Sequence, residues 1–144
     1  MYVTTIEPFR ARAVSDGTQS VGYPAWSPDE RRLGVEVKDG SSTQAGVIDV
    51  ESGALRLLTN QRGQTWVRGW SPDGRKLAVA ALRDGVWSLQ WLDADGGGRG
   101  IITPPAPPNV YLRYPEWSPQ GGVVVFERGE LRGNIWILTL SRAP

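Results

Sequence analysis

The pentapeptide Trp-Ser-Pro-Asp-Gly at residues 70–74 decides the fold, because two close variants of it recur in the chain. Trp-Ser-Pro-Asp-Glu at 26–30 precedes it by 44 residues, and Trp-Ser-Pro-Gln-Gly at 117–121 follows it by 47 residues. A repeat of about 40–50 residues has the length of one four-stranded propeller blade. The proline presets one turn dihedral, and the polar residues and glycine after it suit a tight turn between two strands. The chain is therefore predicted to be an all-β propeller of antiparallel blades.

Each repeat predicts short strands, since β-branched and apolar residues alternate with turn signals and no convincing helical pattern occurs. Strands are expected at 21–26, 33–37, 45–49 and 54–59, then at 65–70, 77–82, 86–92 and 100–103, and finally at 112–117, 123–126 and 134–138. Residues 1–144 are predicted to form one domain with repeats at about 16–59, 60–103 and 104–140. Because Glu30 replaces the turn glycine, we expect the first turn to be less well formed.

The third repeat has no predicted fourth strand, and residues 9–15 are expected to supply one from the other end of the chain. Ser15 precedes Trp26 by 11 residues, the same interval that separates Thr59 from Trp70. Three blades are fewer than the about 4–8 that close a ring, and an open half-ring would expose two apolar faces. We therefore expect a twofold homodimer forming one six-bladed ring, in which residues 9–15 of each copy complete blade three of the other.

Composition excludes several kinds of chemistry. The 144 residues include no cysteine and no histidine, so disulfides, thiol catalysis and imidazole bases within this chain are excluded. Sixteen basic and fifteen acidic residues leave a net charge of +1, which predicts no strong attraction to nucleic acid or anionic membranes. No apolar run approaches membrane-spanning length, and residues 1–7 lack the features of a signal peptide. We expect no metal site, no cofactor and no membrane insertion.

Residues 70–79, together with 92–97 and 101–103, resemble the TolB-type β-propeller repeat, and the resemblance extends over roughly residues 9–140. This resemblance implies a six-bladed architecture and a periplasmic or extracellular location. It also implies a bacterial scaffold that binds partners, since TolB-like repeats occur in noncatalytic propellers of prolyl-oligopeptidase-type enzymes and in sensor proteins.

Candidate binding residues are arginines and aromatic residues, which most often anchor interfaces. They are expected at the channel mouth, on inner strands or on the loops around them: Tyr23, Arg62, Trp66, Arg68, Arg83, Arg113, Tyr114 and Arg128. The repeated tryptophans Trp26, Trp70 and Trp117 are instead expected in the core, because they recur with the blade. Trp87 is expected to pack between blades.

These features favour a non-enzymatic scaffold that binds a protein or an acidic peptide at the channel mouth. No Gly-x-Ser-x-Gly nucleophile motif occurs, which agrees with a noncatalytic role. One alternative is a noncatalytic fragment of a larger TolB-like, prolyl-oligopeptidase-type or sensor protein. Another is a propeller that binds a glycan or small molecule through Trp66, Tyr23 and Tyr114.

Overall fold

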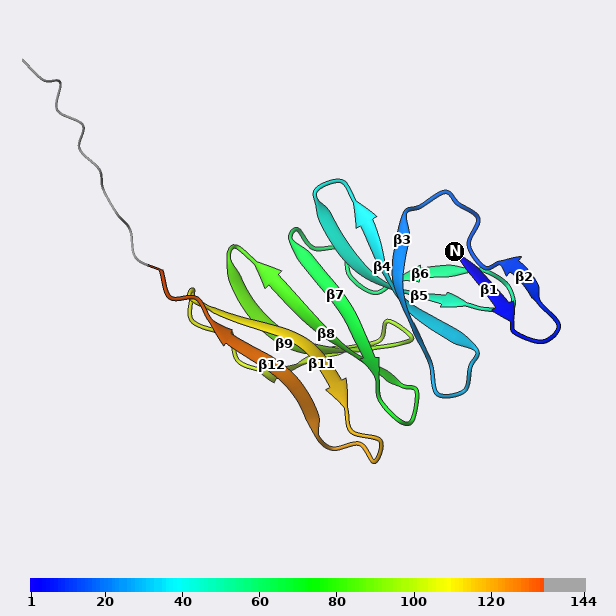
Figure 1. The fold of residues 1–144 in the computed structure, drawn as a ribbon. Coiled ribbons are helices and arrows are strands. Elements are labelled where there is room, and N and C mark those ends of the chain that lie inside the picture. Colours follow the sequence, from blue (N-terminus) through cyan, green and yellow to red (C-terminus); the bar gives the residue numbers. More distant parts are fainter. Residues whose placement is uncertain (134–144) are drawn as a thin grey trace, which may run out of the picture.

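The structure, a computed structural model, describes residues 1–133, which form twelve β-strands (Figure 1). No helix forms in this part of the chain, and so none there could cross a membrane. The strands are β1 (Tyr2–Thr5), β2 (Arg10–Ala13), β3 (Val21–Trp26), β4 (Arg32–Asp39), β5 (Ser42–Asp49), β6 (Leu55–Leu57), β7 (Gln64–Trp70), β8 (Lys76–Arg83), β9 (Val86–Asp93), β10 (Arg99–Thr103), β11 (Val110–Trp117) and β12 (Val124–Glu130). The all-β fold class is confirmed.

Two complete blades form in the order of the sequence. Strands β3 to β6 make blade one and β7 to β10 make blade two, with every neighbouring pair antiparallel. A single parallel bridge between Thr43 and Gln64 joins the two blades. Strands β11 and β12 pair as the inner half of blade three. The third strand expected at 134–138 lies outside the described residues.

The N-terminal segment is a hairpin, β1–β2, at the opposite end of the molecule from β11–β12 (Figure 1). A strand within residues 9–15 was predicted, but its partner β1 was not. The pairing repeats that of blade one at an offset of 44 residues, since Thr4 lies opposite Ala11 and Ile48 lies opposite Leu55. Strands β1 and β2 are therefore equivalent to the third and fourth strands of a blade.

The core consists of apolar layers between consecutive blades, because each thin blade buries its faces against its neighbours. One layer joins the β1–β2 hairpin to blade one, a second joins blades one and two, and a third joins blade two to β11. Their buried residues include Val14, Val35 and Ile48 in the first layer, Val47, Trp70 and Leu77 in the second, and Leu89, Val110 and Leu112 in the third.

The repeated tryptophans differ in burial, which corrects the prediction that all three lie in the core. Trp70 is 7% exposed, and its indole Nε1 donates to the Ala25 carbonyl of the preceding blade at 2.9 Å. Trp26 is 47% exposed, because no inner strand precedes blade one among residues 1–133. The preceding blade therefore accounts for the difference between Trp26 and Trp70. Trp117, which follows the complete blade two, is half-buried, and its indole Nε1 has no hydrogen-bond partner among residues 1–133.

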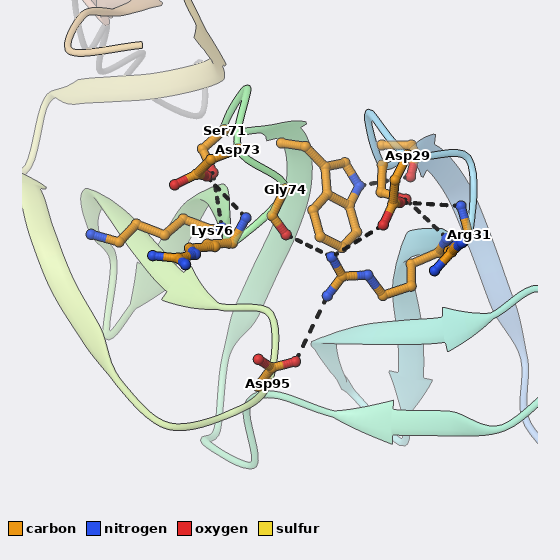
Figure 2. Close-up of polar contacts among 12 residues, drawn as sticks. Asp29, Arg31, Ser71, Asp73, Gly74, Lys76 and Asp95 are labelled. Atoms are coloured by element: carbon orange, nitrogen blue, oxygen red, sulfur yellow. Dashed lines mark hydrogen bonds and ion pairs between the residues drawn. The ribbon is translucent and has the colours of Figure 1, made fainter.

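The Ser-Pro-Asp turns are held by a repeated pair of hydrogen bonds (Figure 2). The Ser71 hydroxyl donates to Asp73 at 2.5 Å and accepts the Lys76 backbone N–H at 2.9 Å. Ser27 donates in the same way to Asp29 at 2.5 Å. In both turns the serine hydrogen bond is the main cause that lowers the pKa of the aspartate.

Arg32 of blade one binds the Ser-Pro-Asp-Gly turn of blade two at residues 71–74. Its Nη2 donates to the Gly74 carbonyl at 2.8 Å, and its guanidinium lies 5.0 Å from the Trp70 ring centroid. Nη1 lies 3.7 Å from a carboxylate oxygen of Asp95 (Figure 2). Because Arg32 is half-buried, this bond and cation–π contact add to the apolar packing of the same interface.

The turn at Glu30 is fully formed, contrary to expectation. The Glu30 N–H donates to the Ser27 carbonyl at 2.9 Å, just as that of Gly74 donates to Ser71 at 2.8 Å. Glu30 adopts a left-handed φ of 57°, close to the 67° of Gly74. The hydrogen bonds of the turn therefore hold a residue with a side chain in a conformation that favours glycine.

We predict that Glu30→Gly raises the free energy of unfolding by about 1 kcal/mol, because it removes left-handed strain. Urea denaturation of the variant and the native chain measures the change. Arg31→Gly is the control, since Arg31 has no left-handed φ and its replacement should not stabilise the chain. An equal or lower stability of Glu30→Gly would contradict the prediction.

Candidate functional site

The innermost strands β3, β7 and β11 each contain a β-bulge at the equivalent place. In each of them, the register of pairing with the next strand shifts two to four residues before the tryptophan of the Trp-Ser-Pro motif. Bulges redirect side chains and are common next to functional sites. The side chains at these bulges are those of Tyr23, Arg68 and Tyr114.

Two of these bulges hold tyrosines in the left-handed region. Tyr23 has a φ of 51° and Tyr114 a φ of 52°, and each precedes a proline. Such a conformation costs on the order of 1–3 kcal/mol and persists only where the surrounding structure imposes it. The sequence pattern Tyr-Pro-x-Trp, present twice, marks these positions.

Arg68 connects these two tyrosines. Its guanidinium carbon lies 5.6 Å from the ring centroid of Tyr23 and 5.2 Å from that of Tyr114, within cation–π range. Its Nη2 lies 3.6 Å from Glu36 Oε1. Arg68 thus contacts blades on both sides, and part of its charge is balanced by a carboxylate.

Glu36 is a buried acid that the sequence analysis missed as a site residue. It lies on β4, and burial raises its pKa from an ordinary 4.5 to about 7 although the Arg68 charge acts in the opposite direction. Its Oε1 accepts no hydrogen bond among residues 1–133. The available signal was one carboxylate within an otherwise apolar strand.

A cavity of about 380 Å³ opens between blade two and β11. Trp66 and Trp87 stack on one side of it, with ring centroids 4.9 Å apart and planes at 15°. Trp87 was expected to pack between blades, which it does, but it also faces this cavity. The lining residues are Trp66, Arg68, Ala80, Trp87, Arg113 and Tyr114.

Arg113 is the exposed cation of this cavity. Its guanidinium carbon lies 4.5 Å from the Tyr111 ring centroid and 5.5 Å from that of Trp87. No ion pair involves Arg113 within the described part of the chain. Glu127, which lies opposite it on β12, accepts the Tyr111 hydroxyl at 3.2 Å instead. The charge of Arg113 is therefore available to an anion in the cavity.

The structure brings together five of the residues predicted from the sequence. Four of them line the cavity, namely Trp66, Arg68, Arg113 and Tyr114, and the fifth, Tyr23, contacts Arg68. The remaining arginines lie elsewhere. Arg83 donates to the Thr65 hydroxyl at 2.6 Å and to backbone carbonyls of its own hairpin, and burial lowers its pKa. Arg62 and Arg128 are exposed outside the cavity lining. We therefore leave these three out of the proposed site.

Glu36 should make stability depend on pH. Because its pKa is raised on folding, the folded chain binds more protons than the unfolded chain between pH 4.5 and about 7. The free energy of unfolding should therefore fall as pH rises through this window, by up to about 3 kcal/mol. Urea denaturation at intervals from pH 5 to pH 8 measures this fall.

In this experiment Glu36→Gln should flatten the profile, because an amide does not titrate. Glu127→Gln is the matched control and should keep the native profile, since Glu127 is exposed. A Glu36→Gln profile as steep as that of the native chain would contradict the assignment.

Comparisons with known proteins agree with this architecture. No protein-family model matches the sequence. Tricorn protease homolog 1 of Streptomyces coelicolor is 28% identical over 149 residues, covering 95% of this chain and 14% of that protein. TolB from Acinetobacter baumannii superimposes with a TM-score of 0.67 at 16% identity, covering 90% of this chain and 34% of the other. A protein provisionally designated TolB from Agrobacterium tumefaciens gives 0.53 at 18% identity, covering 84% and 62%.

The chain thus spans less than two thirds of the length of each of these relatives. Its backbone superimposes on the solved TolB structures over most of its own length. The resemblance that the sequence suggested is confirmed at the level of fold: residues 1–133 have the fold of a TolB-type β-propeller.

Proposed function

We propose that the chain is a non-enzymatic propeller segment that binds an acidic peptide in the cavity between blade two and β11. The observation that carries this proposal is Arg113, a cation held between Tyr111 and Trp87 with no ion pair among the described residues. A guanidinium binds a carboxylate through two parallel hydrogen bonds, and aromatic neighbours orient it for this purpose.

The second arginine of the cavity has a different role. Arg68 already lies 3.6 Å from Glu36 and contacts Tyr23 and Tyr114. It positions the two tyrosines and keeps the potential of the cavity positive, while Arg113 takes the ligand carboxylate. Replacing Arg68 would leave Glu36 buried without its cation, so Arg68 is a poor first target for mutation.

The size and lining of the cavity favour a peptide side chain or two over a large ligand. A volume of about 380 Å³ is at the small end for ligand pockets, which range from about 300 to 1,000 Å³. Trp66 has one ring face covered by Trp87, which leaves less aromatic surface for a sugar ring. The peptide proposal is therefore favoured over the glycan alternative.

A noncatalytic segment of a larger protein would be compatible with this proposal. The chain matches only 14% of the length of the tricorn protease homolog. No group of three or more potential metal ligands occurs among residues 1–133. The proposed site depends on three consecutive inner strands, all of which belong to this chain.

We predict that a capped six-residue peptide rich in glutamate binds the chain and that its glutamine counterpart binds much more weakly. Arg113→Ala should weaken binding of the glutamate peptide at least about tenfold, the cost of one charged hydrogen-bonded contact. Isothermal titration calorimetry measures both peptides, and quenching of tryptophan fluorescence reports on Trp66 and Trp87.

Arg128→Ala is the matched control, because Arg128 is exposed on β12 and outside the cavity lining. It should bind the peptide as the native chain does. Equal affinity of the two peptides, or an unchanged affinity of Arg113→Ala, would refute the proposal. Quenching by neutral sugars in place of peptides would support the glycan alternative.

A further inference from the structure

We propose that a second cavity, between blade one and blade two, binds a small zwitterion: a free α-amino acid with an apolar side chain. This cavity has a volume of about 390 Å³, which suits a small molecule, and it shares no residue with the Arg113 cavity. Two arginines and two aspartates meet an apolar surface there. The lining residues are Arg32, Val47, Asp49, Ala54, Leu55, Arg56, Ala94 and Asp95. The inference is independent of the proposed peptide site.

The pairing of strands places the charged residues of blade one on a single face of its sheet. Arg32 on β4 lies directly opposite Asp49 on β5, and Arg56 on β6 lies directly opposite Val47 on β5. Because Val47 and Asp49 are two residues apart on one strand, all four side chains are on the same face. Val47 belongs to the apolar layer shared with blade two, so this face is directed toward blade two.

Blade two completes the cavity with the turn that follows β9. Ala94 of this turn is buried in the apolar layer between the blades, and Asp95 extends toward Arg32 of blade one (Figure 2). Arg56 Nη1 donates to the backbone carbonyl of Asp95 at 3.0 Å, which joins the turn to the outer strand of blade one. The cavity therefore exists only where the two blades meet.

The two guanidinium groups retain hydrogen-bond donors for a ligand carboxylate. Within residues 1–133 the Arg32 guanidinium makes one hydrogen bond, to the Gly74 carbonyl, and that of Arg56 makes one, to the Asp95 carbonyl. One carboxylate oxygen of Asp95 lies 3.7 Å from Arg32 Nη1 and 4.0 Å from Arg56 Nη1, and both distances are too long for a hydrogen bond. Because a guanidinium has several N–H donors, a carboxylate can bind between the two arginines without breaking a bond of the fold.

The two aspartates can bind the ammonium group of the same ligand. The Ser52 N–H and hydroxyl donate to Asp49 Oδ1 at 2.8 Å and 2.6 Å, and Oδ2 accepts no hydrogen bond within the described residues. The hydroxyl bond is the main cause that lowers the pKa of Asp49, so this carboxylate is ionised at neutral pH. The side chain of Asp95 is 87% exposed. Since two positive and two negative charges cancel, the cavity suits a ligand that carries both signs better than a simple anion.

The equivalent place in blade two is filled by a side chain. At the offset of 44 residues Trp91 replaces Val47 and Gly100 replaces Arg56, and these two residues also lie opposite each other. A Cβ atom on Gly100 would lie 2.5 Å from the Trp91 ring, so the indole occupies the space above the glycine. The open cavity of blade one is therefore not required by the blade fold itself.

We predict that L-leucine binds the chain and that binding needs both of its charges. Isothermal titration calorimetry compares L-leucine with L-leucinamide, which lacks the carboxylate, and with N-acetyl-L-leucine, which lacks the ammonium group. Each derivative should bind at least about tenfold more weakly, because it loses one charged hydrogen-bonded contact. No detectable binding of L-leucine, or equal binding of either derivative, would overturn the proposal.

Substitutions at two exposed lining residues assign the binding to this cavity. Arg56→Gln and Asp95→Asn should each weaken L-leucine binding at least about tenfold, since each removes one charge that the ligand contacts. Arg62→Gln and Asp84→Asn are the matched controls, because both residues are exposed and lie outside the cavity lining. Urea denaturation checks that all four variants are folded. Native affinity in both Arg56→Gln and Asp95→Asn would overturn the proposal.

A further variant separates this cavity from the proposed peptide site. Arg113→Ala should keep the native affinity for L-leucine, because Arg113 does not line the second cavity. Loss of L-leucine binding in Arg113→Ala, with binding retained in Arg56→Gln, would place the amino acid in the other cavity and overturn the proposal.

Discussion

The structure depends on the contact that each blade makes with the blade before it. Blade two shows this contact in full: the Trp70 indole donates to the Ala25 carbonyl, and Arg32 of the preceding blade lies over the same ring. A single four-stranded sheet cannot bury both of its faces, so its apolar residues become core only when a neighbour is present. The same dependence explains why Trp26 is exposed while Trp70, its equivalent, is buried.

The candidate site follows from this stacking and belongs to no single blade. Arg68 comes from blade two, Tyr23 and Glu36 from blade one, and Tyr114 from β11. The bulges on the inner strands direct Tyr23, Arg68 and Tyr114 to one place, and the packed blades hold the two tyrosines in a strained conformation. The buried Glu36 lowers the net charge of the arrangement, so that the exposed Arg113 remains its main binding cation.

The sequence predicted local features well, because repeats and turn chemistry act over a few residues. The strands of blades one and two were predicted from the sequence. Five of the residues that lie together at the candidate site were predicted as well. The turn at Glu30 was expected to be poorly formed, yet its hydrogen bonds impose a left-handed φ on a residue other than glycine. Strand β1 was missed because Tyr2–Thr5 has no turn motif of its own, and it is identified by its pairing with β2.

By itself the sequence determined the all-β class, the blade length and the turns, since spacing and turn residues are properties of neighbouring positions. The tertiary structure decided which equivalent residues have different environments. Arg83 is bound to its own hairpin while Arg113 lines a cavity, although both were equal candidates in the sequence. The physical reason is that burial, ion pairing and solvent exposure depend on residues far away in the chain, which only the packing of one blade on another brings into contact.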